Sequence, residues 1–417
     1  MSHFDVAVIG GGAAGLMAAG SAAKHGAKTI LLEKMEKPAR KVRITGKGRC
    51  NITNARALSD FEAEIHNAQF MRAAFDAFSN RHIVELLQAQ GVATTVERGQ
   101  RVFPASGRAA DVANALERWA RQQGASISTQ WPVENLHPLP QGGFALYGRN
   151  GETITAWAVV VATGGLSYPL TGSTGDGLYL AKQLGHSIIS PLPSLVGIEV
   201  SRPFYKANGL TLKNVCASLW VDQQLVAVQQ GEVMLTDFGL EGAAILRLSR
   251  LAIEQHSQHR RVEIRLDLKP ALSHEQLFNR LVRELEPIPT LEMRGLLRKL
   301  MPAPMIPHVL ALCRLSASTQ ANSLSDEELS AVVDMLKAIP FSMAGHRPWA
   351  ESIVTAGGVS IDEIEQHTMQ SKLHRGLYFA GEVMDVDANT GGFNLQIAFS
   401  SGYLAGRSAA KQTDFLR

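Results

Sequence analysis

A glycine-rich turn near the start of the chain constrains the fold more than any other feature. Residues 4–15 are an apolar run that enters a Gly-x-Gly-x-x-Gly turn. A run of small residues then leads to a second apolar run, residues 29–32, which ends at an acid, Glu33. A strand, a glycine turn, a helix, a second strand and a terminal acid in this order indicate one complete βαβ unit that binds a dinucleotide.

Each glycine of the turn has a separate steric role. Gly10 permits the tight turn, Gly12 lets a pyrophosphate approach the backbone, and Gly15 lets the helix pack closely on the strand. The phosphates then lie at the N-terminus of the helix, and the acid is placed for the ribose hydroxyls. We therefore assign the following residues to the cofactor: Gly10, Gly12, Ala13, Ala14, Gly15, Glu33 and Lys34.

A cationic segment follows this unit. Residues 38–59 contain six lysine and arginine residues and no acid, and residues 45–54 are rich in glycine and short polar side chains. Such a loop can present N–H groups and cations to a pyrophosphate or an electron-rich ring, although a solvated cationic surface is the alternative. The predicted cofactor contacts of this segment are Lys41, Gly48, Arg49, Cys50 and Asn51.

Cys50 has two interpretations. Its cationic neighbours, Lys47 and Arg49, would lower the pKa of the thiol and favour the thiolate, which suggests a redox or covalent role. The alternative is a small residue that packs the loop, and we favour it because no second cysteine lies nearby in the sequence to form a disulfide.

The stretch Gly-Lys-Gly-Arg-Cys-Asn-Ile-Thr-Asn at residues 46–54 resembles the GGGRCN-T-N signature of the YhiN/BaiN-like flavoproteins. That family has an FAD domain of the glutathione-reductase type, so the resemblance implies FAD as the cofactor. Lys47 departs from the pattern, which has glycine at this position. Residues 235–246 also resemble the family's FTH-GLSGPA stretch, with Asp237 and Glu241 as departures. The resemblance covers nearly the whole chain.

Two further segments match FAD domains of this class. The run at residues 126–136 resembles the strand that contacts the adenine, with Val133 as the expected residue. Residues 155–165 are an apolar run that ends in Ala-Thr-Gly-Gly, which assigns Thr163 and Gly164 to the cofactor.

The C-terminal part returns to the same domain. Residues 376–387 resemble the strand, glycine and acid that meet the ribityl chain, and a helix opens after Asn389 and runs to about residue 406. The N-terminus of that helix would offer N–H groups to flavin N1 and O2, where negative charge accumulates on reduction. The residues assigned here are Gly381, Glu382, Asp387, Gly392, Asn394 and Leu395.

The predicted fold is α/β, a discontinuous Rossmann-type FAD-binding domain with an inserted β-rich subdomain and a small helical subdomain. The FAD-binding domain takes residues 1–190 and 345–417, the β-rich insert 191–268 and the helical insert 269–344. A chain of 417 residues is long enough for two or three domains. Serine caps are expected for helices that begin after Ser273 and Ser325.

The three cysteines lie far apart with no C-x-x-C pair, which argues against disulfides and a metal site. They fit a reducing cytoplasm. No apolar run reaches membrane-spanning length. The net charge of +3 is too small to imply a polyanionic partner, but residues 247–314 hold twelve Lys and Arg against seven Asp and Glu, so RNA is a possible partner beside a small-molecule substrate. The sequence does not fix the oligomeric state.

An FAD-dependent oxidoreductase follows from these motifs, and several chemistries stay open. The first is reduction of a carbonyl-conjugated C=C bond in a small enone or steroid-like molecule, and the second is the same reaction on uridine in RNA, giving dihydrouridine. The third is oxidation of a small amine or amino-ketone, and a non-catalytic flavin-binding module is a fourth. NAD(P)H could be a transient electron donor, without a domain of its own.

Two residues are candidates for catalysis. Tyr168 could donate a proton, and Arg347 could orient a carbonyl or phosphate, in a cleft expected between the insert and the FAD domain. The alternatives are a packed interface ring for Tyr168 and a pair with a surface acid for Arg347.

Overall fold

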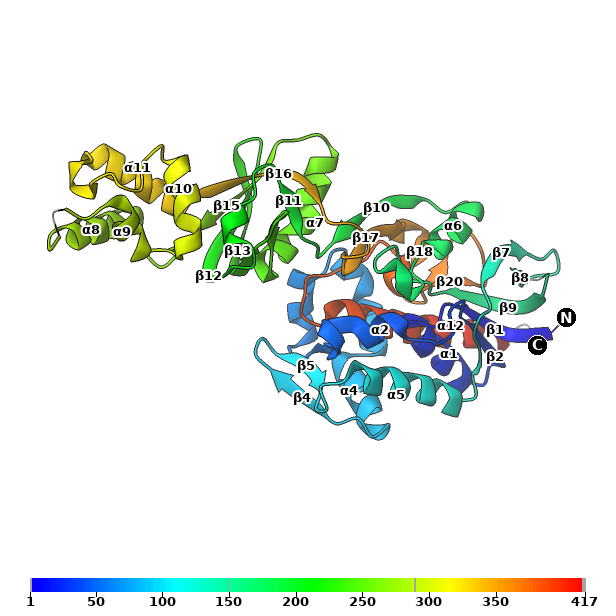
Figure 1. The fold of residues 1–417 in the computed structure, drawn as a ribbon. Helices are drawn as coiled ribbons and strands as arrows, with labels where there is room; N and C mark the ends of the chain where they lie inside the picture. Colours follow the sequence, from blue (N-terminus) through cyan, green and yellow to red (C-terminus); the bar gives the residue numbers. More distant parts are fainter. Residues whose placement is uncertain (1, 150, 289, 415–417) are drawn as a thin grey trace. The chain divides into compact units, whose positions relative to one another are not determined.

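The computed structural model describes residues 2–149, 151–288 and 290–414, and the chain forms two compact units (Figure 1). The first unit comprises Met1–Pro193 and Ser352–Arg417, and the second comprises Ser194–Glu351. The first unit is therefore discontinuous in sequence.

The first unit is built on a mixed sheet whose centre is parallel. Its strands lie in the order β18 (Ile364–Glu365), β19 (Gln370–Ser371), β20 (Leu377–Phe379), β9 (Thr153–Val161), β1 (Ser2–Ile9), β2 (Thr29–Leu32) and β6 (Ser126–Ser128). Strands β7 (Val133–Pro138) and β8 (Phe144–Gly148) extend it, with β8 antiparallel to β9. Since β1 pairs in parallel with β2 and β9, the ends of these three strands meet at one edge of the sheet, where dinucleotides bind in this type of fold.

Two long helices cover the central strands. Helices α1 (Ala13–Lys24) and α12 (Phe393–Asp414) pack on each other and on β1, as Figure 1 shows. The close approach requires glycine, because a Cβ atom at Gly402 or Gly406 would lie 2.3 or 2.1 Å from the carbonyl oxygens of Ala14 and Ala18.

The other helices of this unit are α2 (Arg40–Ile44), α3 (Arg72–Ala77), α4 (Asn80–Ala89), α5 (Ala109–Gln122) and α6 (Asp176–Gln183). Two small sheets complete it: β3 (Thr53–Asn54), β5 (Arg101–Pro104) and β4 (Thr94–Glu97) form one, and β10 (Ile188–Ser194) and β17 (Val354–Val359) form the other.

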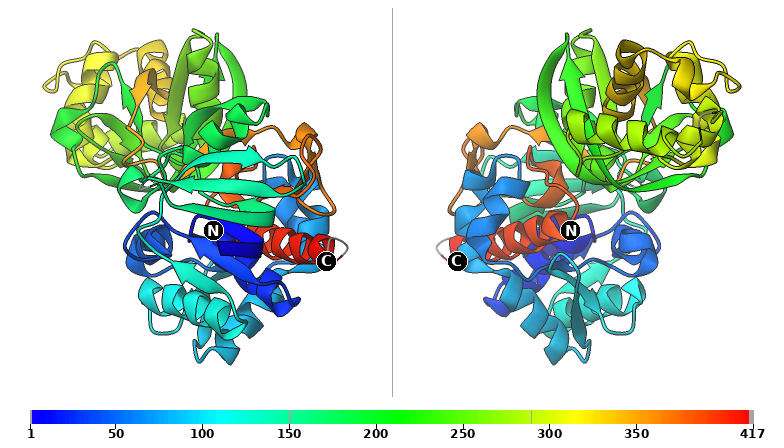
Figure 2. Two further views of the ribbon diagram at one scale, coloured as in Figure 1. Left: turned by 90° about the vertical axis from the view of Figure 1, so that its right-hand side faces the viewer. Right: turned by 90° about the vertical axis from the view of Figure 1, so that its left-hand side faces the viewer.

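The second unit contains a closed antiparallel barrel, and most of its strands are green in both views of Figure 2. The strand order is β11 (Ile198–Val200), β14 (Gly239–Glu241), β13 (Gln224–Leu235), β12 (Thr211–Val221), β15 (Val262–Asp267) and β16 (Ile339–His346). Helix α7 (Ala243–Ser257) packs against several of these strands. Buried side chains alternate with more exposed ones along β12 and β15, as expected for strands with one face in a core.

The described residues between β15 and β16 contain four α-helices. They are α8 (His274–Leu285), α9 (Met293–Arg298), α10 (Ile306–Leu312) and α11 (Asp326–Lys337). Both predicted serine caps are confirmed, because Ser273 accepts the N–H of Gln276 at 3.1 Å and Ser325 accepts that of Glu328 at 3.3 Å.

The structure confirms the α/β class and the Rossmann-type domain, and it differs from the sequence-based expectations in three places. The run 126–136 is two strands, because Gln130 has a positive φ of 57° and Pro132 has no N–H to donate. Residues 339–344, expected in the helical insert, belong to the barrel strand β16. Helix α12 continues to Asp414, eight residues beyond its expected end. No helix in the described part of the chain is both long enough and apolar enough to cross a membrane.

Candidate cofactor site

The glycine turn has the geometry that the sequence predicts. Gly10 has φ of 99°, and a Cβ atom at Gly15 would lie 1.8 Å from the carbonyl oxygen of Gly10. Gly12 differs, because a Cβ atom there would meet nothing within 4 Å. Gly12 is also the N-cap residue of α1, which has no side-chain cap and no acid in its first turn. The helix N-terminus, which begins at Ala13 and Ala14, therefore faces open space that suits a phosphate.

Glu33 lies at the end of β2 beside this turn. Its carboxylate accepts the N–H of Gly11 at 2.7 Å through Oε2 and that of Met35 at 2.7 Å through Oε1. Burial raises the pKa of Glu33 above its ordinary value, and the two backbone hydrogen bonds act in the opposite direction. The hydrogen bond to Gly11 fixes the carboxylate next to the turn, where a ribose hydroxyl could bind it.

A pocket of about 410 Å³ is lined by residues that follow Glu33 in the sequence and by residues that precede β7, and most of these side chains are polar. Its lining is Lys34, Met35, Glu36, Arg40, Gln130, Pro132 and Arg149. Val133, the predicted adenine contact, directly follows this lining as the first residue of β7. The N–H groups of Gln130 and Trp131 donate to the carbonyls of Met35 and Glu33, which holds this segment against the end of β2. The pocket therefore suits the adenosine half of the cofactor. Lys34 is itself held by Asp176, at 2.7 Å.

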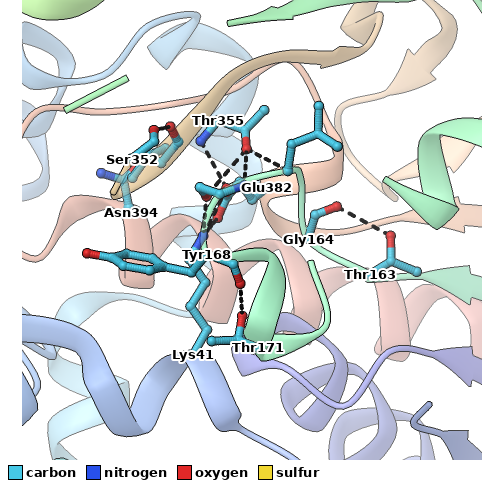
Figure 3. Close-up of polar contacts among 12 residues, drawn as sticks. Lys41, Thr163, Gly164, Tyr168, Thr171, Ser352, Thr355, Glu382 and Asn394 are labelled. Atoms are coloured by element: carbon cyan, nitrogen blue, oxygen red, sulfur yellow. Dashed lines mark hydrogen bonds and ion pairs between the residues drawn. The ribbon is translucent and has the colours of Figure 1, made fainter. Parts of the chain in front are cut away.

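Four residues from distant parts of the first unit form the Lys41–Glu382 cluster: Lys41, Ser167, Thr355 and Glu382 (Figure 3). The Lys41 ammonium lies 2.7 Å from Glu382 Oε2 and 2.5 Å from Ser167 Oγ. The Ser167 hydroxyl donates to Glu382 Oε1 at 2.6 Å, and the Thr355 N–H donates to the same oxygen at 2.9 Å.

The cluster joins α2, the loop after β9, strand β17 and the turn that contains Gly381 and Glu382. Ser167 and Thr355 are buried, and only about a fifth of each of the Lys41 and Glu382 side chains is exposed. Sequence reasoning selected Lys41 and Glu382 and missed the other two. Thr355 lies in a Thr-Ala-Gly-Gly segment, which is the one local signal that could have indicated it.

The loop after α2 corrects one prediction about Cys50. The thiol is fully buried, and burial raises its pKa to about 11, so the expected lowering of this pKa by cationic neighbours is wrong. The burial fits the interpretation that we favoured, a small side chain that packs the loop. The nearby cation does not act on the sulfur, since Arg49 pairs with Glu97 and lies over the ring of Phe103. Lys47, which replaces the family's glycine, has φ of 57°, in the region that favours glycine.

The start of α12 meets this loop. A Cβ atom at Gly392 would lie 2.4 Å from the backbone of Thr53, so the two segments touch through glycine. Asn51 lies between them, with its amide placed to reach the Thr53 carbonyl and the Gly392 N–H. Asn394 fixes the chain before the helix, because its amide accepts the Ala388 N–H at 2.9 Å and donates to the Ala388 carbonyl at 2.7 Å.

The remaining predicted cofactor residues lie in the same unit. Gly164 follows β9 with φ of 73°, and the hydroxyl of the preceding Thr163 donates to its carbonyl. Gly48 also has a positive φ, of 83°, with no atom near its missing Cβ. Asp387 is buried, and Leu395 packs against the core in the first turn of α12. The contacts of these residues with a cofactor stay predictions.

The two catalytic candidates lie in different units. Tyr168 belongs to the first, has φ of 53°, and its ring extends away from the Lys41–Glu382 cluster in Figure 3. Arg347 belongs to the second, where it pairs with Glu199 at 3.0 Å and Glu351 at 2.7 Å; these hydrogen bonds raise its pKa. A joint role of Tyr168 and Arg347 stays a prediction.

The residues of the first unit fit FAD. The open space at Gly12 would accept a pyrophosphate, the pocket lined by Lys34 and Gln130 would accept an adenosine, and the start of α12 presents a helix N-terminus. A family model described as the HI0933-like protein Rossmann domain matches residues 4–408. The chain belongs to this family. The resemblance to the YhiN/BaiN-like flavoproteins is thereby confirmed.

Two curated relatives match the chain over almost its full length. A 3-dehydro-bile acid delta(4,6)-reductase of Clostridium scindens is 31% identical over 411 residues, which are 98% of this chain and 99% of the relative. A ribosomal RNA dihydrouridine synthase of Escherichia coli is 27% identical and covers 97% of each chain.

A solved structure shows the same fold. The 3-ketosteroid-delta4-(5alpha)-dehydrogenase from Rhodococcus jostii matches 99% of this chain and 97% of its own, with a TM-score of 0.53 and 14% identity. The family and the curated relatives show that the chain is an FAD-dependent oxidoreductase.

Proposed function

We propose that the protein reduces a carbon–carbon double bond conjugated to a carbonyl in a small enone or steroid-like molecule. The observation that carries the proposal is the 31% identity to a bile acid reductase across 98% of the chain. The likeness extends over both units, so it is not confined to the FAD-binding unit.

Bound FAD supplies hydride chemistry at the conjugated bond. In the proposal the chain's own residues hold that cofactor: the N-terminus of α1 holds the phosphates and Glu33 holds the ribose. The Lys41–Glu382 cluster fixes the turn that begins at Gly381, so the predicted ribityl-binding segment is held in one conformation. Tyr168 is the candidate proton donor. Arg347 is paired with Glu199 and Glu351, and these ion pairs favour a structural role for Arg347.

Reduction of uridine in RNA is the second candidate, because two ribosomal RNA dihydrouridine synthases are 27% and 28% identical to the chain. RNA binding draws on cations that are free to contact phosphates. Several cations of residues 247–314 are instead paired with acids, namely Arg250, Arg260, Arg265 and Lys299. This pairing reduces the charge available to a polyanion and favours the small substrate.

The product of turnover tests the proposal. The FAD-loaded protein is incubated with NADH or NADPH and either a steroid 4-en-3-one or ribosomal RNA that lacks dihydrouridine, and the products are analysed by mass spectrometry. We expect the enone to gain two hydrogen atoms, and a control steroid with an isolated double bond to stay unchanged. Gain of two hydrogen atoms by uridine, with no change of the enone, would contradict the proposal and support the second candidate.

A further inference from the structure

A cationic pocket of about 370 Å³ lies in the first unit, at the C-terminal end of α12. We call it the α12 pocket, and its lining is His367, Thr368, Gln370, Arg375, Tyr378, Arg407, Ser408, Lys411 and Gln412. Every lining side chain is polar, three are permanent cations, and none is an acid. An acid outside this lining, Glu365, accepts the N–H of His367 through its carboxylate at 3.3 Å.

The three cations of the α12 pocket carry like charges, and among the described side chains none of them has an ion-pair partner. Arg407 and Lys411 are four residues apart on one helix face, an arrangement that destabilises a helix when the charges are alike. Arg375 adds a third charge from the turn before β20. None of the three forms an ion pair with another side chain in residues 2–149, 151–288 or 290–413.

The floor of the pocket is fixed by hydrogen bonds. Tyr378 is almost fully buried, and its hydroxyl donates to Gln412 Oε1 at 2.5 Å. Gln370 donates to the same oxygen at 2.8 Å. Burial raises the pKa of Tyr378, so its hydroxyl stays protonated at neutral pH, although the charge of Arg375 acts in the opposite direction. The pocket therefore combines three cations with a neutral floor in which Tyr378 and Gln370 are both hydrogen-bonded to Gln412.

We propose that the α12 pocket binds a small phosphorylated molecule about the size of a mononucleotide. Arginine presents a planar set of N–H donors that matches a phosphate, and two arginines with a lysine can neutralise its two charges. The volume is at the lower end of the range for small-molecule pockets, about 300–1,000 Å³. The pocket begins fourteen residues after the start of α12, about 20 Å along the helix axis, so it does not overlap the predicted flavin contacts of that helix.

Calorimetric titration of the FAD-saturated protein tests this proposal. The probes are adenosine 5′-monophosphate, adenosine, inorganic phosphate and a short single-stranded RNA. We expect the nucleotide to bind at least about tenfold more tightly than adenosine, and the double variant Arg407→Ala/Lys411→Ala to lose at least about tenfold in affinity. The double variant Lys24→Ala/Lys182→Ala, which removes exposed cations from the last turns of α1 and α6, should bind like the parent.

The ligand-free variants provide a second readout. Because the removed charges repel each other, Arg407→Ala/Lys411→Ala should have a Tm equal to or above that of the parent, which also shows that it folds. Equal nucleotide binding by the parent and this variant would overturn the proposal. Binding of the RNA through Arg407 and Lys411, with no binding of the nucleotide or phosphate, would overturn it as well and assign the pocket to a phosphodiester chain.

Discussion

The cations of residues 40–56 and those of the α12 pocket have the same charge, but the two groups differ in whether acids pair with them. The first group includes the pairs Lys41–Glu382, Arg49–Glu97 and Arg56–Glu64. Arg375, Arg407 and Lys411 have no such partner in the described part of the chain whose side chains are placed. A run of positive charge in a sequence therefore does not show which cations can bind a ligand, because acids brought in by the fold decide it.

A similar contrast exists within the glycine turn. The chain itself fills the space next to Gly15, whereas the space next to Gly12 is open to a ligand. Gly15→Ala places a methyl group 1.8 Å from a carbonyl oxygen, so we expect a loss of about 3 kcal/mol in the free energy of unfolding. Gly12→Ala points its methyl group into open space and should lose less than about 1 kcal/mol. Chemical denaturation of the apoproteins measures both, and equal losses would remove the distinction between the two glycines.

Breaking the Lys41–Glu382 cluster should also cost stability. Lys41→Met removes the ammonium from a largely buried carboxylate, with an expected loss of about 2–3 kcal/mol in the free energy of unfolding. Arg49→Met is the matched control, because its pair with Glu97 is more exposed and should contribute less than about 1 kcal/mol. If the two variants unfold at the same denaturant concentration, the more buried pair does not contribute more stability than the more exposed pair.

A variant of Glu33 tests whether this residue binds the cofactor. Glu33→Ala removes the predicted charge-assisted hydrogen bond to the ribose and should cost about 1.5–3 kcal/mol of FAD binding, a loss of about 10- to 150-fold in affinity. Fluorescence titration of the apoprotein with FAD measures the Kd. Glu62→Ala, which removes an exposed acid of the same unit, should bind FAD like the parent. Full FAD affinity in Glu33→Ala would reject the assignment of Glu33.

A buried histidine gives the smallest expected effect. His186 lies 3.0 Å from Glu363 and 2.9 Å from Ser371, and burial lowers its pKa. Below pH of about 6.5 the unfolded chain binds a proton that the folded chain resists, so His186 contributes stability above that pH and loses it as the pH falls. Replacement by Gln should flatten the dependence of Tm on pH between about 5 and 6.5. An unchanged slope would show that other groups control it.

Local features of the sequence predicted much of the fold. The β1–α1–β2 unit follows from a pattern within about thirty residues, and the caps at Ser273 and Ser325 follow from the side chains of single helices. Strand β16 was not predicted as part of the barrel, because it pairs with β11 and β15 across long stretches of chain. Pairing partners of that kind depend on the folded topology.

Some residues of the candidate site could likewise be predicted from local sequence patterns, and others could not. The glycines and Glu33 were found because their spacing carries the chemistry. Ser167 lies 126 residues from Lys41 and 215 residues from Glu382, and Lys41 lies 341 residues from Glu382, so no local pattern connects them. The pKa of Cys50 was predicted in the wrong direction because neighbours in sequence do not reveal burial. The α12 pocket was missed because it combines residues of the strands before α12 with one face of that helix.

The rate at which the reduced protein is reoxidised tests the central claim most directly. The FAD-loaded protein is reduced with dithionite without oxygen and mixed in a stopped-flow instrument with a steroid 4-en-3-one, or with uridine-containing ribosomal RNA, while the flavin absorbance is followed. Our account predicts rapid return of the oxidised flavin spectrum with the enone, at a rate that rises with its concentration, and slow return with the RNA. Return at the same slow rate with the enone as with buffer alone would contradict it.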